Sequence, residues 1–164
     1  MTVNRKTKLF TVAILLALVV PTVLSIAPAW ACGGCDCPCT GTPGYWKNHP
    51  EAWPVEEITI GGVTYTRDGE YGAIWWLNQP VKGDKSITMF KALVAAKLNG
   101  LSGCDDSCIA DTILETDTDW FVDCGPVGSG VEARSECWQY SHGEALYWDL
   151  DAYNNGELCA APRD

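Results

Sequence analysis

The chain has few basic residues and very few histidines. Its 164 residues include 11 lysines and arginines against 21 aspartates and glutamates, only two histidines, and a formal net charge of −10. Because so acidic a surface repels the phosphates of nucleic acids and the headgroups of anionic lipids, the composition excludes nucleic-acid binding as a function. The same charge favours cations and solubility.

The sequence also lacks the motifs of common hydrolases and the features that divide a chain into several domains. It has no HExxH zinc motif, no nucleophile elbow and no Ser, His and Asp order typical of a catalytic triad. No long repeat, linker or low-complexity run interrupts the chain after residue 31. We therefore expect a single domain there.

Residues 1–31 have the pattern of a cleaved signal peptide. The basic head consists of Arg5, Lys6 and Lys8. An apolar stretch follows at Leu9–Val23, and Ala29-Trp30-Ala31 fits a small-x-small cleavage site. An uncleaved membrane anchor is the alternative, because the apolar segment approaches the length that spans a bilayer. Cleavage would leave 133 residues with eight basic and 21 acidic side chains, a net charge of −13, and predicts a secreted or cell-surface protein.

All nine cysteines follow the predicted cleavage point, and in an exported chain they predict a disulfide framework. The candidates for disulfide bonds are Cys35, Cys37, Cys39, Cys104, Cys108, Cys124, Cys137 and Cys159. The odd count leaves one cysteine over. Lipidation of Cys32, the first mature residue, would account for it, and a free or intermolecular thiol is the alternative. One pairing that we consider joins Cys39 to Cys159, which would close a loop of about 120 residues.

Four of these cysteines lie within eight residues, in the CGGCDCPC sequence from Cys32 to Cys39. Thiolates so close together could wrap a zinc or copper ion, or take part in redox chemistry. The segment lacks the second, well-separated ligand pair of a zinc ribbon or finger. We therefore expect residues 32–41 to form a cysteine-rich segment bridged to distant cysteines, with metal binding as the alternative.

The densest motif of the chain is Thr42–Pro54, which reads TPGYWKNHPEAWP. Pro43 suits the first position of a helix, and Pro50 ends that helix and opens a second turn, so the motif predicts two compact helical turns. Two interpretations remain open: the tryptophans form a small core, or the polar side chains form a ligand site or an acid/base pair on an aromatic floor. The ligand-binding candidates are Tyr45, Trp46, Lys47, His49, Glu51 and Trp53.

Four segments give the chain a family resemblance: TPGYWKNHPEAWP, ITIGGVTYT, LNQPVKGDKSITMFKALVAAKLN and LDAYNNG. They resemble a domain of exported bacterial and archaeal proteins in which the first motif reads TQGYWKNHPEAWP, followed by a hairpin, an AAKLN helix and LDxYNNG. The resemblance implies that residues 42–164 form one domain of this type. That family has no assigned activity. The resemblance therefore implies a fold and export from the cell, but it does not imply a reaction. This chain differs in its run of cysteines and in Pro43, where Gln is common.

The remaining pattern predicts one hairpin and several helices. Glu57–Ile60 and Val63–Thr66 alternate apolar and polar residues around Gly61-Gly62, which is a strong hairpin signal. Four helices are expected. The first runs from Asp68 to Leu77, and the second from Asp84 or Ser86 to a stop at Asn99-Gly100. The third follows the turn between Cys104 and Cys108, and the fourth runs from a capping box at Ser141 and Glu144 to Asn155-Gly156. The GPVGSG loop between Cys124 and Cys137 is expected to be flexible. These elements predict a small α+β domain, one hairpin packed on about four short helices and stabilised by disulfides, with a mainly α fold as the alternative.

Asp117, Asp119 and Asp123 are closely spaced carboxylates, the kind of ligand that calcium requires, and they suggest a calcium site. Their segment lacks the central glycine and closing glutamate of an EF-hand loop. Calcium at these aspartates is therefore an alternative only, and we expect no bound cofactor.

Three classes of function follow. The first is an exported, non-enzymatic, tryptophan-rich acidic module that binds a glycan or a protein, or assembles, at the cell surface. The second is a small secreted hydrolase that uses Glu51 and His49, with Glu56 or Glu57 as a second carboxylate. The third is a metal-binding or redox protein that works through Cys32–Cys39. Membrane contact is expected only through a lipid or an uncleaved anchor.

Overall fold

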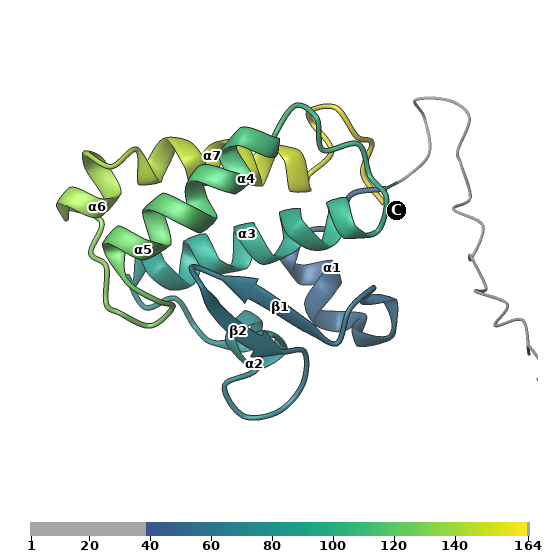
Figure 1. Ribbon diagram of the computed structural model, residues 1–164, viewed down its shortest axis with the longest axis horizontal. Coiled ribbons are helices and arrows are strands. Elements are labelled where there is room, and N and C mark those ends of the chain that lie inside the picture. The colour runs from purple at the N-terminus through teal and green to yellow at the C-terminus, as the bar shows by residue number, and fades with distance from the viewer. Residues whose placement is uncertain (1–38, 164) are drawn as a thin grey trace, which may run out of the picture.

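Helix α3 (Lys85–Leu101) runs through the middle of the structure, a computed structural model that describes residues 39–163 (Figure 1). On one side of α3 lie α1 (Pro43–Asn48), the strands β1 (Glu57–Ile60) and β2 (Val63–Thr66), and α2 (Ala73–Asn78). On the other side lie α4 (Ala110–Glu115), α5 (Phe121–Cys124) and α7 (Gly143–Asn154). The 3₁₀ turn η1 (Pro50–Ala52), the π-helical turn η2 (Thr116–Trp120) and α6 (Glu136–Gln139) complete the set of named elements.

This architecture confirms the predicted α+β fold with a single hairpin and disulfide bonds. The described chain has a two-stranded antiparallel sheet and more helical segments than the four expected, because several are single turns of four to six residues. The two turns predicted for the TPGYWKNHPEAWP motif are α1 and η1. Thr42 caps α1 by accepting a hydrogen bond from the backbone N–H of Tyr45.

The hairpin forms at the predicted glycine pair. Gly61 and Gly62 have φ angles of 58° and 75°, the left-handed values that a two-residue turn between antiparallel strands requires. Ile58, Ile60 and Tyr65 are buried, and β1 packs on α3. A hairpin alone is only marginally stable in water, so this apolar face against α3 is what holds it.

The core of the domain surrounds α3. The predicted stripe of Ile87, Phe90, Leu93, Val94 and Leu98 is buried, together with Met89 and the alanines of the helix. Asp84 caps the helix as expected, because its carboxylate accepts a hydrogen bond from the Ser86 N–H at 2.9 Å. The helix is therefore enclosed on almost every side.

The predicted helix stop at Asn99-Gly100 is wrong, since α3 continues to Leu101. Asn99 is fully buried and uses its side chain to contact other segments. At Gly100 a Cβ atom would come within 2.7 Å of the Asp106 carboxylate. The Asn-Gly pair is thus explained by tertiary contacts, and the local signal for a helix end was misleading.

Two predicted helix starts are also wrong. Helix α2 begins after Gly72 and not at Asp68, whose carboxylate pairs with Arg67 and does not cap the helix. Gly72 is required there because a Cβ atom would lie 2.6 Å from the Asp68 carbonyl oxygen. Helix α7 begins after His142, without a side-chain cap, so Ser141 and Glu144 do not form a capping box. Gly143 determines this start, because its Cβ would meet the Trp120 ring nitrogen at 2.6 Å. The predicted end of this helix at Asn155-Gly156 is confirmed.

Three disulfides join the described cysteines: Cys39–Cys104, Cys108–Cys159 and Cys124–Cys137. The pairing of Cys39 with Cys159 is wrong. The backbone N–H of Cys39 bonds to the carbonyl of Ala161, two residues beyond Cys159, which leaves Cys159 beside Cys108. Residues 1–31, Cys32, Cys35 and Cys37, and with them the signal peptide, the lipid and the metal interpretations, lie outside the described residues.

The loop between Cys124 and Cys137 is held in place, contrary to the expected flexibility. The Asp84 carboxylate accepts hydrogen bonds from the N–H groups of Gly130 and Val131, and the Ser86 hydroxyl accepts one from Gly128. Val127 and Val131 are buried. The helix cap of α3 therefore also orders this loop. None of the helices within residues 39–163 combines the length and apolar character needed to cross a bilayer.

Candidate functional site

The TPGYWKNHPEAWP motif, the first candidate site, contributes its tryptophans to the core. Trp46 is fully buried, and its ring nitrogen donates to the Asn99 side-chain oxygen at 2.9 Å. Trp53 is buried as well, and its ring nitrogen donates to the Trp46 carbonyl at 2.8 Å. Both rings are thus structural, as one of the two interpretations held, and neither is open to a ligand.

The polar residues of the motif lie outside this core and contact one another. The rings of Tyr45 and His49 stack with centroids 4.6 Å apart, and His49 Nδ1 lies 2.9 Å from a carboxylate oxygen of Glu51. The hydrogen bond from His49 lowers the pKa of Glu51, which is exposed. A general acid needs the opposite shift, so this pair has the character of a surface ion pair. Lys47 is half-buried.

Nearby, two lysines lie where α1, α2 and α3 meet. Lys91 donates to the Gln79 carbonyl at 2.6 Å, a bond that covers the end of α2. Burial, and then the positive charge of Lys47, lowers the pKa of Lys91. Glu56 and Glu57, the candidates for a second catalytic carboxylate, have other surroundings. Glu56 pairs with Arg67, and Glu57 is exposed on β1.

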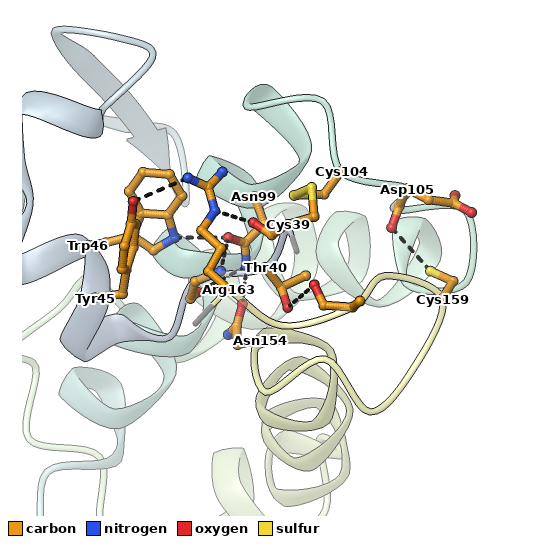
Figure 2. Close-up of a disulfide and its surroundings, with 12 residues drawn as sticks. Cys39, Thr40, Tyr45, Trp46, Asn99, Cys104, Asp105, Asn154, Cys159 and Arg163 are labelled. Carbon is orange, nitrogen blue, oxygen red and sulfur yellow. Dashed lines mark hydrogen bonds between the residues drawn. A yellow bond between two sulfur atoms is a disulfide. The ribbon is translucent and has the colours of Figure 1, made fainter. Parts of the chain in front are cut away.

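A buried amide network centred on Asn99 joins the first motif to α3 and α7 (Figure 2). The Asn99 side-chain oxygen accepts from the Gly41 N–H at 2.7 Å and from the Trp46 ring, while its nitrogen donates to the Gly41 carbonyl and to the Asn154 side-chain oxygen. Asn154 in turn donates to the Ala92 carbonyl at 2.9 Å. Every hydrogen-bonding position of the Asn99 amide is therefore used.

The two ends of the described chain lie side by side at this network (Figures 1 and 2). Thr40 pairs with Pro162 in a parallel bridge. The Arg163 guanidinium lies 5.2 Å from the Tyr45 ring and 5.1 Å from the Trp46 ring, and it donates to the Cys39 carbonyl. The chain therefore enters and leaves the domain at one place.

The three aspartates considered for calcium take different positions. Asp117 contacts the hairpin, because its carboxylate accepts a hydrogen bond from the Gly61 N–H at 2.8 Å. The same carboxylate forms an ion pair of 2.6 Å with Lys97, and Lys97 also donates to the Thr59 carbonyl. Asp119 and Asp123 line a separate hollow of about 170 Å³. Within residues 39–163 no group of three or more acidic, histidine or cysteine side chains has an arrangement that could hold a metal ion.

A shallow depression beside α6 and α7, open to solvent and called the groove below, is the feature that sequence reasoning missed. It has a volume of about 350 Å³, and its lining residues are Trp138, Gln139, His142, Glu144, Ala145 and Trp148. Trp148 is 58% exposed, whereas Trp138 is buried. The groove thus offers one open indole ring beside three polar side chains.

The backbone before α7 positions the polar side of this groove. His142 has a φ of 54°, a left-handed conformation that is uncommon outside glycine. The turn exposes the imidazole and places it between the groove and the neighbouring hollow lined by Glu115, Asp119 and Asp123. No lysine or arginine is among the lining residues of either depression. Lys85 lies 4.5 Å from the Trp138 ring centre but does not line the groove.

One signal in the sequence could have revealed the groove. The inward face of α7 is formed by Leu146, Leu150 and Tyr153, and Trp148 lies on the opposite side of a helix with that stripe. A tryptophan on the polar face of an amphipathic helix is not required by the core. Elsewhere, the exposed Tyr71 lies just before α2, and its ring centre is 4.8 Å from that of the half-buried Trp75.

Comparison with known proteins found no matching protein family, no similar curated protein and no similar solved structure. The resemblance to exported domains that share the TxGYWKNHPEAWP, AAKLN and LDxYNNG pattern therefore stays a prediction.

Proposed function

We propose that this protein is an exported, non-enzymatic module that binds a partner at the cell surface through the groove beside α6 and α7. The observation that carries the proposal is the position of Trp148. Its indole is 58% exposed and lines the groove. Helix α6, which supplies two of the lining residues, lies at the end of the molecule opposite the chain ends (Figure 1).

Export is supported by the disulfides and by the predicted signal peptide. Three disulfide bonds within residues 39–163 are what an oxidising compartment produces and a reducing cytosol prevents. Two of them, Cys39–Cys104 and Cys108–Cys159, lie near the paired chain ends. Outside the cell these bonds would keep the domain folded by limiting the conformational freedom of the unfolded chain.

The placement of the chain ends suits a tethered module. A segment that precedes Cys39, whether it carries a lipid, an anchor or a bond to another protein, joins the domain beside its carboxyl-terminal residues. The groove is lined in part by α6, which lies at the far end of the long axis from the chain ends (Figure 1). An attached domain would therefore present the groove away from its attachment point.

Binding is favoured over catalysis by the contacts of the candidate acid and base. Glu51 and His49 pair with each other at the surface, and the pair lies in α1 and η1, away from the groove. Trp148, in contrast, has the open apolar surface that dominates recognition sites. Covering about 100–150 Å² of the ring would contribute roughly 3 kcal/mol before the cost of association.

The test is co-sedimentation of the mature protein with envelopes of the cells that produce it. Trp148→Ala should weaken binding at least tenfold, since such a ring contributes on the order of 1.4 kcal/mol or more at an interface. Tyr71→Ala is the matched control, because Tyr71 is also an exposed aromatic residue, at 59%, but lies by α2. Equal binding by the two variants, or no binding by the unmodified protein at high concentration, would contradict the proposal. Thermal melts verify that both variants fold.

A further inference from the structure

The groove combines an open aromatic ring with polar groups along one edge. Ala145 and Trp148 are three residues apart on α7 and both line the groove, so the neighbour of the indole ring on this side is a small side chain. The face of an indole carries partial negative charge, which attracts the weakly positive C–H bonds on the face of a sugar ring. Gln139 and His142, both exposed, supply hydrogen-bond donors and acceptors for hydroxyl groups.

The charged side chains that line the groove and the adjoining hollow are mainly acidic, and the Lys85 ammonium lies behind them, 4.5 Å from the Trp138 ring. Glu144 lines the groove itself, and Glu115, Asp119 and Asp123 line the adjoining hollow, with His142 shared by both. The ion pairs found within residues 39–163 use other carboxylates, those of Glu51, Glu56, Asp68 and Asp117. The four carboxylates at this end therefore have no cationic side chain as a partner. They disfavour an anionic ligand and attract a cationic one.

We infer that the groove binds a glycan that carries free amino groups, an inference that rests on the proposed function and specifies its ligand. One sugar ring stacks on Trp148, its hydroxyl groups bond to Gln139 and His142, and an ammonium group lies beside Glu144. A cation next to the ring adds to the attraction of the indole face. A lysine-rich peptide would satisfy the carboxylates but has no flat face of C–H bonds to stack on the indole ring.

Three probes separate these chemistries: a glucosamine tetramer, the matching N-acetylglucosamine tetramer, and a lysine tetrapeptide. Titration calorimetry with the mature protein at about pH 6 keeps both the amines and the carboxylates charged. We expect the glucosamine tetramer to bind at least tenfold more tightly than either of the other probes. Its affinity should fall steeply with added salt, because the contribution of the carboxylates is screened.

Variants assign the effect to the groove. Glu144→Gln should weaken glucosamine binding at least threefold and leave N-acetylglucosamine binding unchanged, while Glu57→Gln, the control on β1, should change neither. Trp148→Ala should remove binding of both glycans. Equal affinity for the two tetramers, equal affinity for the lysine peptide, or no glucosamine binding would each overturn the inference. Trp148-dependent binding to envelopes would in that case leave the proposed function standing, because that assay does not depend on the amine.

Discussion

Replacing Asn99 by alanine should destabilise the protein more than any other single polar substitution in the described chain. The side chain is fully buried and makes four hydrogen bonds, to both backbone groups of Gly41, to the Trp46 ring and to the Asn154 amide. Asn99→Ala leaves two buried N–H donors without an acceptor, at a cost of about 1–3 kcal/mol each. We therefore expect a loss of roughly 4 kcal/mol, a large share of the 5–15 kcal/mol typical of a domain.

The assay is urea unfolding of the oxidised protein, followed by tryptophan fluorescence. Asn155→Ala is the control, because Asn155 is exposed and its side chain bonds only to the Asp151 carbonyl within its own helix. That variant should lose less than about 0.5 kcal/mol. Asn99→Asp should be at least as damaging as the alanine variant, since it cannot donate to Gly41 or Asn154 and adds a buried charge. A cost for Asn99→Ala near that of Asn155→Ala would refute the network as a source of stability.

Three further predictions concern other parts of the chain. Tyr153→Phe should change the free energy of unfolding by less than about 0.5 kcal/mol in urea, because the buried Tyr153 hydroxyl has no hydrogen-bond partner within residues 39–163. Burial, and then the charge of Glu157, raises the pKa of Asp151, so the folded state loses stability as pH rises through the titration range of that group. Asp151→Asn should accordingly stabilise the protein by a few tenths of a kcal/mol at about pH 7 and have no effect at about pH 2, and a destabilised variant at neutral pH would contradict this. Mass spectrometry after alkylation without reduction should find the six described cysteines protected and, because nine is odd, at least one of Cys32, Cys35 and Cys37 alkylated, acylated or bonded to a second molecule.

Local patterns in the sequence predicted those parts of the fold that local physics determines. Gly61-Gly62 produced the hairpin because only a left-handed turn joins strands so closely, and Asp84 capped α3 because its carboxylate reaches the first free N–H groups. The two prolines of the TPGYWKNHPEAWP motif placed α1 and η1. Each of these signals acts over a few residues.

The errors arose where distant segments decide the outcome. Asn99 reads as the end of a helix in isolation, yet its partners Gly41 and Asn154 are more than fifty residues away in either direction. Gly143 sets the start of α7 through a contact with Trp120, a residue of another helical turn. The disulfide partners likewise depend on how the carboxyl-terminal segment passes Cys39.

The candidate site was beyond local reasoning for the same reason. The groove needs α6, the left-handed turn at His142 and one side of α7 to be brought together. The motif richest in candidate site residues supplies core tryptophans, whereas the exposed ring of Trp148 belongs to α7, whose pattern predicts only an amphipathic helix. Only the outward position of Trp148 in that helix pointed to it.

Oxidative footprinting of the surface aromatic residues tests the central claim, that the groove end of the domain is its binding face, most directly. Hydroxyl radicals modify exposed rings, and mass spectrometry compares the free protein with the protein bound to envelopes of the cells that produce it. We expect protection of Trp148 on binding and unchanged modification of Tyr71, which has a similar exposure. Protection of Tyr71 with Trp148 still open to modification would contradict the claim.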